Sequence, residues 1–509
     1  MARPTGGPRR GQSRAGLPIL VLVVAAILSW SCGSGSSPPS LRGSATAASG
    51  ALALSFAVPS FLATLSPATV AAAVLAAVAL LILVIVAPML SSLLRYWRAL
   101  AFFWMGGRYA QVPASLGLSI FGRAHLYSLA SVPWLMRQPH YRAGTFQDDM
   151  LANLRNVVLP TGIYGMPLSF FARSRALAVF CIGVVIPMAA CVGSFWRRWR
   201  GLETSAAECF RRELLAPTDW FQLWRLNCRL ASMTALATGS KDFELEDKWR
   251  FISACLEKGI PVTPVLNQPV TLIAKDVNEE GGMGIHVLKN VMHGGRWILQ
   301  EKLDNCDAVK ALLPENAPLS TLRVVTGSRG ALAALPSGGS AAKETKAKAL
   351  CTVWRAGRKG ASTDHSCVMV NVPGASLGGE VLGTGSSSAQ WYARGWKSLG
   401  MPVSTRDGVL TAHPDTGLAL QGQNLPGAAA AAALCERAHD SLMPGVPLAG
   451  WDVAFCPPEG SSVGAVPRLV LLEANLSCNF FRGDVAWDEY AALLDEHFTA
   501  IDAWRRSRE

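Results

Sequence analysis

The sequence predicts a C-terminal domain of mixed helices and strands, an α+β fold, preceded by an N-terminal helical membrane region. Half of the 509 residues are hydrophobic, and this excess lies mostly within residues 1–200. Those residues carry 17 arginines, no lysine and two acidic side chains, a net charge of +15, whereas the rest of the chain carries −3. Beyond residue 205, amphipathic helical segments give way to short β-branched runs bounded by turns. An apolar, arginine-rich part is therefore followed by a part with the pattern of a water-soluble domain.

The first segment, residues 1–32, begins with several arginines, continues as an apolar run from Leu17 to Trp30 and ends in small residues. That order is typical of a signal peptide, and a signal anchor fits it nearly as well. Residues 33–69 begin with a stretch rich in Gly, Ser and Pro, and we expect them to form a flexible linker.

Residues 70–94 are expected to form a transmembrane helix. No charged residue occurs between Arg42 and Arg95, and Val70–Leu90 gives 21 residues that are almost all Ala, Val, Leu and Ile. A helix of that length spans a hydrocarbon core of about 30 Å. Residues 95–175 then form a basic juxtamembrane region, which opens with the arginines and tryptophan of an interfacial stop.

A second hydrophobic segment, residues 176–195, has 20 uncharged residues between flanking arginines, although it also contains Gly183 and Pro187. Two interpretations stay open, a helix that spans the membrane and a re-entrant segment partly buried in protein. The nine arginines within 95–175 place that region in the cytosol by the positive-inside rule. If residues 176–195 span, the C-terminal domain lies on the lumenal face; if they only dip in, that domain is cytosolic.

The charge pattern argues against a nucleic-acid partner, because phosphate-backbone binding needs Lys and Arg clustered on the folded domain. Here the arginines flank apolar runs, which fits membrane topology and contact with anionic lipid headgroups. The 12 cysteines are scattered without a CxxC pair. We therefore expect neither a disulfide framework nor a zinc site, and free thiols favour a reducing compartment for the C-terminal domain.

Within residues 205–509 the apolar spacing predicts two helices, Ala206–Leu215 and Trp220–Ala235, before the first strand. The run Ala428–Ala433 predicts a further surface helix, and Pro336–Lys348 an exposed loop. Five strands are expected at Val270–Lys275, Trp297–Glu301, Leu322–Thr326, Trp451–Phe455 and Leu469–Glu473.

A glycine-rich loop follows the first of these strands. Lys275 ends the strand, and Gly281, Gly282 and Gly284 come shortly after it. Glycine lets backbone N–H groups approach phosphate oxygens, and a nearby lysine supplies a compensating charge. The pattern is neither a P-loop nor GxGxxG, and in isolation it is more typical of a tight turn.

Oxygen-bearing side chains lie on the last two predicted strands, with Asp452 on one and Glu473 and Asn475 at the end of the other. Magnesium prefers hard oxygen ligands and is commonly held by one or two carboxylates together with phosphates. Glu473 and Asn475 are two residues apart, so on a strand they project from the same face and can share one ion. In isolation, an acidic strand end followed by a turn-forming asparagine explains the same pattern.

Taken in order, these motifs resemble the ATP-grasp superfamily over about 240 residues. The matching segments are Asp247–Phe251, Gly259–Val262 with Pro264, Ile273–Lys275, Gly281–Gly284, Gln300 with Glu301, Asp452, and Glu473 with Asn475. Three further segments look like the α-L-glutamate ligase-related, sugar-transfer-associated branch: Ser320–Thr326, His413–Gly417 and Gly450–Asp452.

The resemblance implies an ATP-grasp fold, in which two α+β subdomains clamp ATP, with Mg²⁺ or Mn²⁺ as the metal. By position, it implies that Lys248 and Lys275 hold the ATP phosphates beneath the loop of Gly281, Gly282 and Gly284. It further implies that the adenine and ribose meet the segment Gln300, Glu301, Lys302 and Leu303.

The same resemblance implies that Asp452, Glu473 and Asn475 bind the metal. It also implies that Arg323 and Arg355 face the transferred phosphoryl group and the acyl-phosphate intermediate. That role suits arginine, which donates two parallel hydrogen bonds to an oxyanion and keeps its charge.

The implied activity is that of a membrane-anchored ligase, which uses ATP to join a carboxylate to an amine or hydroxyl acceptor. The branch name suggests a glycan-related acceptor, and the supply of ATP favours a cytosolic catalytic domain. The sequence departs from the family where Asp364-His365 replaces Asp-Asn and where Cys367–Asn371 replaces the usual Gly-Gly. These departures favour an alternative, an ATP-binding membrane sensor or scaffold whose catalysis has decayed.

Overall fold

The computed structural model describes residues 67–508 except for several internal segments. The segments outside the described residues are 156–167, 200, 202, 266–270, 276–284, 290–297, 301, 336–344, 362–366, 388–408, 459–465 and 482. The predicted signal segment and nearly all of the predicted linker also lie outside them. Residues 74–509 form one compact unit.

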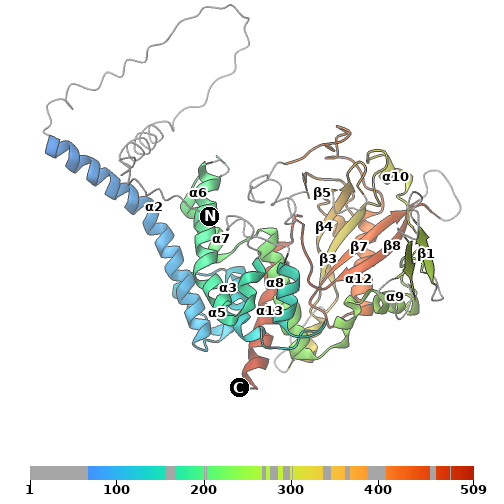
Figure 1. Ribbon diagram of the computed structural model, residues 1–509, viewed down its shortest axis with the longest axis horizontal. Coiled ribbons are helices and arrows are strands. Elements are labelled where there is room, and N and C mark those ends of the chain that lie inside the picture. Colours follow the sequence, from blue (N-terminus) through green and yellow to red (C-terminus); the bar gives the residue numbers. More distant parts are fainter. Residues whose placement is uncertain are drawn as a thin grey trace, which may run out of the picture. The chain divides into compact units, whose positions relative to one another are not determined.

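The first described helix, α2 (Pro67–Trp104), contains the predicted run Val70–Leu90 and continues well beyond it. Its 38 residues correspond to a length of about 57 Å at the α-helical rise. The helix is thus longer than a hydrocarbon core, and its arginine-bearing C-terminal part packs against protein instead (Figure 1). That the apolar run crosses a membrane stays a prediction.

The described residues of 95–175, that is 95–155 and 168–175, fold into a layer of helices. Ser119 and Thr145 cap the N-termini of α3 (Ile120–Leu135) and α4 (Phe146–Leu154), and Thr145 forms a reciprocal capping box with Asp148. Shorter 3₁₀ turns lie before α3, at η2 (Tyr109–Gln111) and η3 (Ala114–Leu116), and after α4, at η4 (Leu168–Arg173).

The second hydrophobic segment forms a continuous helix from Arg175 to Trp199. It consists of α5 (Arg175–Phe180), one π-helical turn η5 (Cys181–Val185) and α6 (Ile186–Trp199). Among the described residues, this is the one helix found to be long and apolar enough to cross a membrane, and 22% of its most apolar stretch is buried.

The helices predicted beyond residue 205 are present. Ser205 caps α7 (Ala206–Leu215), and Asp219 caps α8 (Trp220–Thr238), which ends at the left-handed Gly239. The remaining helices are η6 (Lys241–Glu246), α9 (Lys248–Glu257), α10 (Asp307–Lys310), η7 (Gly330–Ala334), η8 (Ala375–Leu377), α12 (Ala428–Leu442) and α13 (Trp487–Arg506).

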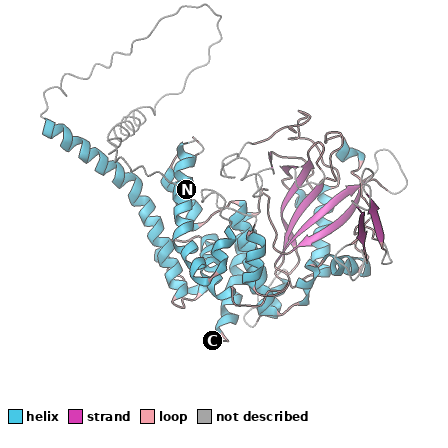
Figure 2. Ribbon diagram, viewed as in Figure 1, coloured by secondary structure: helices cyan, strands magenta, loops and turns pink. Residues whose placement is uncertain are grey.

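The strands form two antiparallel sheets (Figure 2). The larger has six strands in the order β6-β5-β4-β3-β7-β8, and the smaller is the pair β1-β2. Their bounds are β1 Leu272–Lys275, β2 Ile285–Leu288, β3 Thr321–Gly327, β4 Lys348–Gly357, β5 Cys367–Asn371, β6 Gly385–Ser387, β7 Leu448–Cys456 and β8 Arg468–Asn475. The mixed helix-and-strand character expected for residues 205–509 is therefore observed.

Some strand predictions differ from the structure. Within the predicted strand Trp297–Glu301, residues 298–300 form only a single bridge, between Gln300 and Val265. The end of the predicted loop Pro336–Lys348 begins β4, a ten-residue strand that the sequence analysis did not predict. Strands β2, β5 and β6 were also not predicted.

Helices cover both faces of the large sheet. On one face, Val324, Trp354 and Trp451 pack with residues of α9 and α12. On the other, Val325 and Val353 belong to a core shared with α8, α13 and α3. Because both faces are covered, β3 and β7 are buried along their whole length, and they lack the alternation of a half-exposed strand.

Candidate functional site

A set of polar side chains projects from the face of the sheet that is turned toward α8 and α13. Arg323 on β3 lies opposite Asp452 on β7, and Asp452 lies opposite Glu473 on β8. Arg355 on β4 lies opposite Thr321, two residues before Arg323, so that both arginines share this face. Asn475 lies two residues beyond Glu473, also on this face. We call Arg323, Arg355, Asp452, Glu473 and Asn475 the sheet cluster.

Asp452 forms two buried ion pairs at the centre of the sheet cluster. Its Oδ1 accepts a hydrogen bond from Arg323 Nε at 2.6 Å, and its Oδ2 lies 2.8 Å from Arg355 Nη2. All three side chains are less than a tenth exposed. Burial by itself would raise the pKa of the Asp452 carboxyl, but the two guanidinium groups outweigh burial and lower this pKa to about 2. The carboxylate is therefore ionised at neutral pH.

Two residues that the sequence analysis did not single out hold the arginines in place. The hydroxyl of Thr321 accepts hydrogen bonds from Arg355 Nε at 2.9 Å and Nη2 at 2.6 Å. The ring of Phe481 lies 4.7 Å from the guanidinium carbon of Arg323 and 5.6 Å from that of Arg355. Such contacts attract a cation to the face of an aromatic ring.

The backbone is adapted to this arrangement at two points. Phe481 has φ of 48°, a conformation that bulky residues rarely adopt. At Gly450, a Cβ atom would lie 2.7 Å from Cys478 Cβ and 3.0 Å from Arg323 Nη1. Glycine is therefore needed at position 450, because any side chain there would displace the arginine or the segment after β8.

The sheet cluster becomes more exposed toward Glu473. Asn475 Nδ2 donates a hydrogen bond to Glu473 Oε1 at 3.2 Å, and Lys248 Nζ lies 2.7 Å from Glu473 Oε2. Lys248 is the first residue of α9, and its side chain is 66% exposed, against 28% for Glu473. One of the two predicted phosphate lysines, Lys248, and two of the predicted metal ligands are therefore brought together at the accessible end.

The three predicted magnesium ligands, Asp452, Glu473 and Asn475, lie on neighbouring positions of β7 and β8. Asp452 and Glu473 are cross-strand neighbours at a bulge in the β7–β8 pairing, and Asn475 adds an amide oxygen from the same face. In the part of the chain that the structure describes, no group of three or more His, Cys, Asp and Glu side chains is placed to hold a metal. Two carboxylates and an amide are oxygen donors of the kind that Mg²⁺ takes together with phosphates and water. In this structure the carboxylate oxygens are paired with Arg323, Arg355 and Lys248.

The other predicted nucleotide contacts are only partly described. Lys275 is the last residue of β1 and lies opposite Ile285, the first residue of β2. The predicted phosphate loop connects these two strands, and its Gly281, Gly282 and Gly284 lie outside the described residues.

The predicted adenine segment approaches the large sheet at Leu303. This side chain is buried against Ala454 on β7 and Val470 on β8. Since Ala454 and Asp452 are two residues apart on β7, Leu303 packs on the continuation of the face that carries the sheet cluster. Glu301 lies outside the described residues, Gln300 is exposed, and Lys302 points into solvent, 3.4 Å from Asp304.

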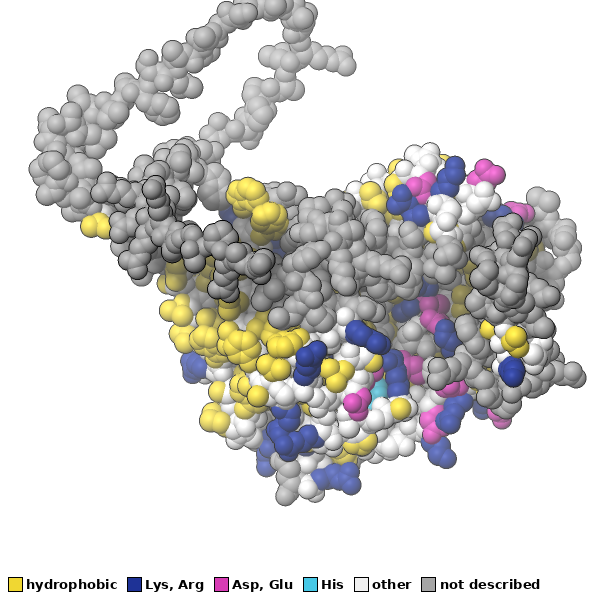
Figure 3. Space-filling view, in the orientation of Figure 1, with side chains coloured by type: hydrophobic (Ala, Val, Ile, Leu, Met, Phe, Trp, Pro, Cys, Tyr) yellow, Lys and Arg dark blue, Asp and Glu magenta, His cyan; other side chains and the backbone are white. Residues whose placement is uncertain are grey.

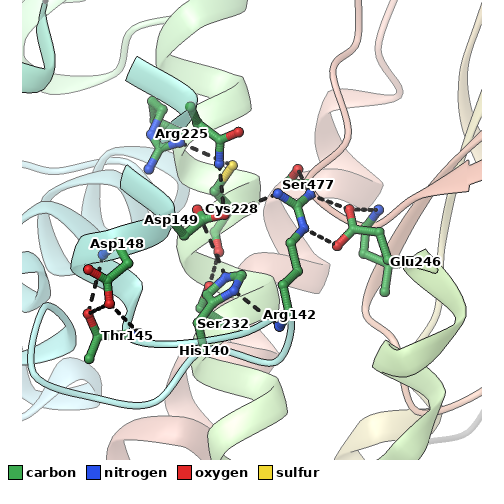
Figure 4. A network of polar contacts seen from close by, with 12 residues as sticks. His140, Arg142, Thr145, Asp148, Asp149, Arg225, Cys228, Ser232, Glu246 and Ser477 are labelled. Carbon is green, nitrogen blue, oxygen red and sulfur yellow. Dashed lines mark hydrogen bonds and ion pairs between the residues drawn. The ribbon is translucent and has the colours of Figure 1, made fainter. Parts of the chain in front are cut away.

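A second polar network adjoins the end of β8 (Figure 4). Arg142, from the turn before α4, donates two hydrogen bonds to Glu246 and one of 3.0 Å to Asp149. Glu246 also accepts a hydrogen bond of 3.2 Å from the backbone N–H of Leu476. Because Leu476 directly follows Asn475, this network ties the helical layer to the strand that carries two of the predicted metal ligands.

The sequence contains only weak indications of the site residues that were not predicted. Phe481 belongs to an aromatic pair that follows Asn475 within a few residues, and Thr321 lies two residues before Arg323. Arg142 and Glu246 are far apart in the sequence, so that no local pattern connects them. Comparison of the chain with protein-family models, with curated proteins and with solved structures gives no match.

Proposed function

We propose that this protein is a membrane-associated, ATP- and Mg²⁺-dependent ligase of the ATP-grasp type. It joins a carboxylate to an amine or hydroxyl acceptor. The observation that carries the proposal is the sheet cluster: two guanidinium groups, two carboxylates and an amide project from one face of four neighbouring strands.

The proposed reaction has two steps. A substrate carboxylate oxygen attacks the γ-phosphorus of ATP, and the bond to the β-phosphate oxygen breaks, which gives an acyl phosphate and ADP. The acceptor nitrogen or oxygen then attacks the acyl carbon and loses its proton, and inorganic phosphate leaves. Such chemistry needs little covalent help from the protein, because alignment and charge neutralisation supply most of the rate acceleration.

The chain's own residues support each requirement. Arginine is the side chain best suited to bind phosphoryl oxygens. Thr321, Asp452 and Phe481 hold Arg323 and Arg355 in place before substrate arrives. Asp452, Glu473 and Asn475 would hold Mg²⁺, which supplies neutralisation of the ATP phosphates. Lys248 lies at the same end of the site and adds a further positive charge.

The test is Mg²⁺-dependent ATP binding by the full-length protein in detergent, measured by titration calorimetry. Glu473→Gln and Lys275→Ala are expected to weaken binding at least tenfold, because each removes one predicted metal or phosphate contact. Lys310→Ala is the matched control, since this exposed lysine lies on α10 outside the sheet cluster. ATP binding that is unchanged in both site variants, or no ATP binding by the parental protein, would contradict the proposal.

One observation favours the alternative of ATP binding without turnover. The segment that departs from the family, Cys367–Asn371, is strand β5, and it is buried along its whole length. Asp484 holds Asn371 by donating its backbone N–H to Asn371 Oδ1 at 2.9 Å. These residues serve packing. Tight Mg²⁺–ATP binding without ADP formation across a broad panel of amine and hydroxyl acceptors would support a sensor or scaffold.

A further inference from the structure

Helix 175–199 presents a continuous stripe of exposed hydrophobic side chains. The stripe comprises Phe180, Val184, Met188, Val192, Phe195 and Trp199, of which Met188 is 61% exposed. These positions recur every three or four residues, so they lie on one side of the helix. On α2 a second stripe consists of Val86, Leu90, Leu94 and Trp97, each more than two-fifths exposed.

The two stripes belong to helices that touch each other. Tyr96 Oη donates to the carbonyl of Ile182 at 2.7 Å, and Trp97 Nε1 donates to the carbonyl of Gly183 at 2.8 Å. Both carbonyls belong to the π turn, where the regular α-helical bonding is interrupted. Two side chains of α2 therefore donate hydrogen bonds to carbonyls of the π turn. A helix that faces hydrocarbon needs such partners, because lipid tails cannot hydrogen-bond to exposed carbonyls.

Figure 3 shows hydrophobic side chains gathered on the side of the molecule where α2 lies, with Lys and Arg below them. Arg173 and Arg175 flank one end of helix 175–199, and Arg197, Arg198 and the tryptophan Trp199 flank the other. Apolar surface bordered by arginine and tryptophan is the pattern of a protein in contact with a lipid bilayer. The bilayer is therefore the occupant that the composition of this surface indicates.

The chain before helix 175–199 and the chain after it share one core. Arg229 Nε donates to Ser128 Oγ at 3.1 Å, and both residues are buried. Tyr127 Oη donates to Asp502 at 3.1 Å, and Arg123 pairs with Asp495 at 2.5 Å. Residues joined by such contacts cannot lie on opposite sides of a hydrocarbon core about 30 Å thick.

Directly after helix 175–199 the chain turns back toward the helical layer. Helix α7 packs along α6, with an ion pair of 3.0 Å between Arg197 and Glu213. At the other end of α7, the carbonyl of Leu215 lies so close to α3 that a Cβ atom on Gly122 would be 2.8 Å from it. Helices α6 and α7 thus form a hairpin, and its second arm leads back to the layer from which the first arm departed.

We propose that helix 175–199 lies in one leaflet of the bilayer without crossing it, with the stripes of helix 175–199 and α2 against lipid and the arginines at both of its ends among the headgroups. Residues 95–155 and the chain from α7 onward, which includes the six-stranded sheet, then lie on the same face of the membrane. Since the arginines of residues 95–175 place that region in the cytosol, the sheet cluster is cytosolic. This topology holds whether or not the sheet cluster binds ATP.

The topology is tested by labelling with a membrane-impermeant maleimide in sealed vesicles of known orientation. Two full-length variants, Ser115→Cys and Lys359→Cys, place a thiol at exposed positions before and after helix 175–199. The parental protein supplies the background from native cysteines. Both variants are expected to react from the same side only. Reaction from opposite sides would overturn the proposal.

Contact with lipid is tested by a nitroxide attached to Met188→Cys in the reconstituted full-length protein. The spin label is expected to be relaxed strongly by oxygen, which concentrates in lipid, and at least fivefold less by a water-soluble nickel complex. A label on Ser115→Cys is the control with the reverse preference. A label on Met188→Cys that is relaxed by the nickel complex would overturn the proposal. A label that neither reagent relaxes would also overturn it, because a second copy of the protein would then cover this surface.

Discussion

Asp452 neutralises two guanidinium groups with its two carboxylate oxygens. A buried charge is costly unless it is paired, and removal of one partner leaves the others uncompensated. Asp452 is therefore the residue on which the placement of both Arg323 and Arg355 depends. It also has a structural counterpart on the surface, because Asp415 pairs with Arg358 at 2.6 Å and its pKa is likewise lowered to about 2.

Asp452→Asn is expected to reduce the free energy of unfolding by about 3–5 kcal/mol, because two buried arginines lose their countercharge. Asp415→Asn should cost less than about 1 kcal/mol, since its arginine partner is 31% exposed and water replaces the carboxylate. Urea unfolding of both variants in detergent measures the difference. Equal losses would show that burial of the sheet cluster does not control its energetics.

His439 makes stability dependent on pH. Its Nδ1 lies 2.7 Å from Thr326 Oγ1, its Nε2 lies 2.9 Å from the carbonyl of Val446, and burial lowers its pKa to about 4. In the unfolded chain the imidazole of His439 is protonated below about pH 6.5, whereas in the folded chain it stays neutral until about pH 4. Stability is therefore expected to fall as pH decreases between these values, by about 1.4 kcal/mol per pH unit for each such histidine.

Urea unfolding midpoints at pH 7, 6, 5 and 4 measure this dependence. In His439→Gln the slope should become smaller but persist, because burial lowers the pKa of His125 and His497 in the same direction. A slope that is identical in the variant and the parental protein would rule out a contribution from His439.

At the residue scale, the sequence predicted which side chains share a strand face better than it predicted the contacts between strands. Glu473 and Asn475 share a face because strand periodicity alone requires it. The pairing of Arg323 with Asp452 depends instead on the register between strands 129 residues apart in the sequence. No local pattern encodes that register. Phe481 was missed for the same reason, since its ring reaches the arginines from a turn after β8.

At the element scale, the end of β8 depends on η6 and on the turn that carries Arg142. Glu246 at the end of η6 binds both Arg142 and the N–H of Leu476, and Lys248 two residues later pairs with Glu473. One short segment therefore connects the helical layer to the exposed end of the sheet cluster. A shift of that layer would reach Glu473 and Asn475, the proposed metal ligands, through this segment.

Arg142→Ala is expected to increase amide hydrogen exchange at Leu476 by about tenfold, because Glu246 loses its bidentate partner and holds the strand end less firmly. Mass spectrometry of the peptide that covers residues 473–478 measures the change. Arg211→Ala is the control, since Arg211 and Glu208 form an exposed pair on α7. Unchanged exchange in Arg142→Ala would mean that β8 is held independently of the helical layer.

Element prediction succeeded where the apolar period was clear. The predicted bounds of Ala206–Leu215 match α7, and those of Trp220–Ala235 differ from α8 only at its C-terminus. Strand β4 was missed because it is covered on both faces, and its run from Lys348 to Gly357 has no period of two. The register and position of such a strand follow from its neighbours, which sequence reasoning had not placed.

At the scale of the whole molecule, the helical layer and the large sheet share a core. Residues of α3, α8 and α13 pack in one cluster with residues of β3 and β4. The sequence predicted a boundary near residue 205, where the composition changes. Amino-acid composition indicates whether a segment faces water or an apolar environment. It does not indicate which segments pack against each other in the folded chain, and the shared core depends on that packing.

The shared core predicts that the helical layer and the sheet unfold together. Cys209 on α7 and Cys351 on β4 are both buried, so each reacts with a thiol reagent only after its surroundings open. Their reactivities should rise over the same range of urea concentration. Cys209→Ser and Cys351→Ser assign each signal. Midpoints that differ by more than about 1 M urea would show two independently folding parts.

The π turn of helix 175–199 determines the direction in which the side chains of α6 point around the helix axis. A π turn holds one residue more than an α turn, and each residue of an α-helix advances the chain by about 100°. Deletion of one residue within Cys181–Val185 would therefore turn α6 by more than a quarter of a revolution. Arg197 would leave Glu213, and Met188 would rotate toward the protein. A single inserted residue thus decides which side of α6 faces α7 and which side faces lipid.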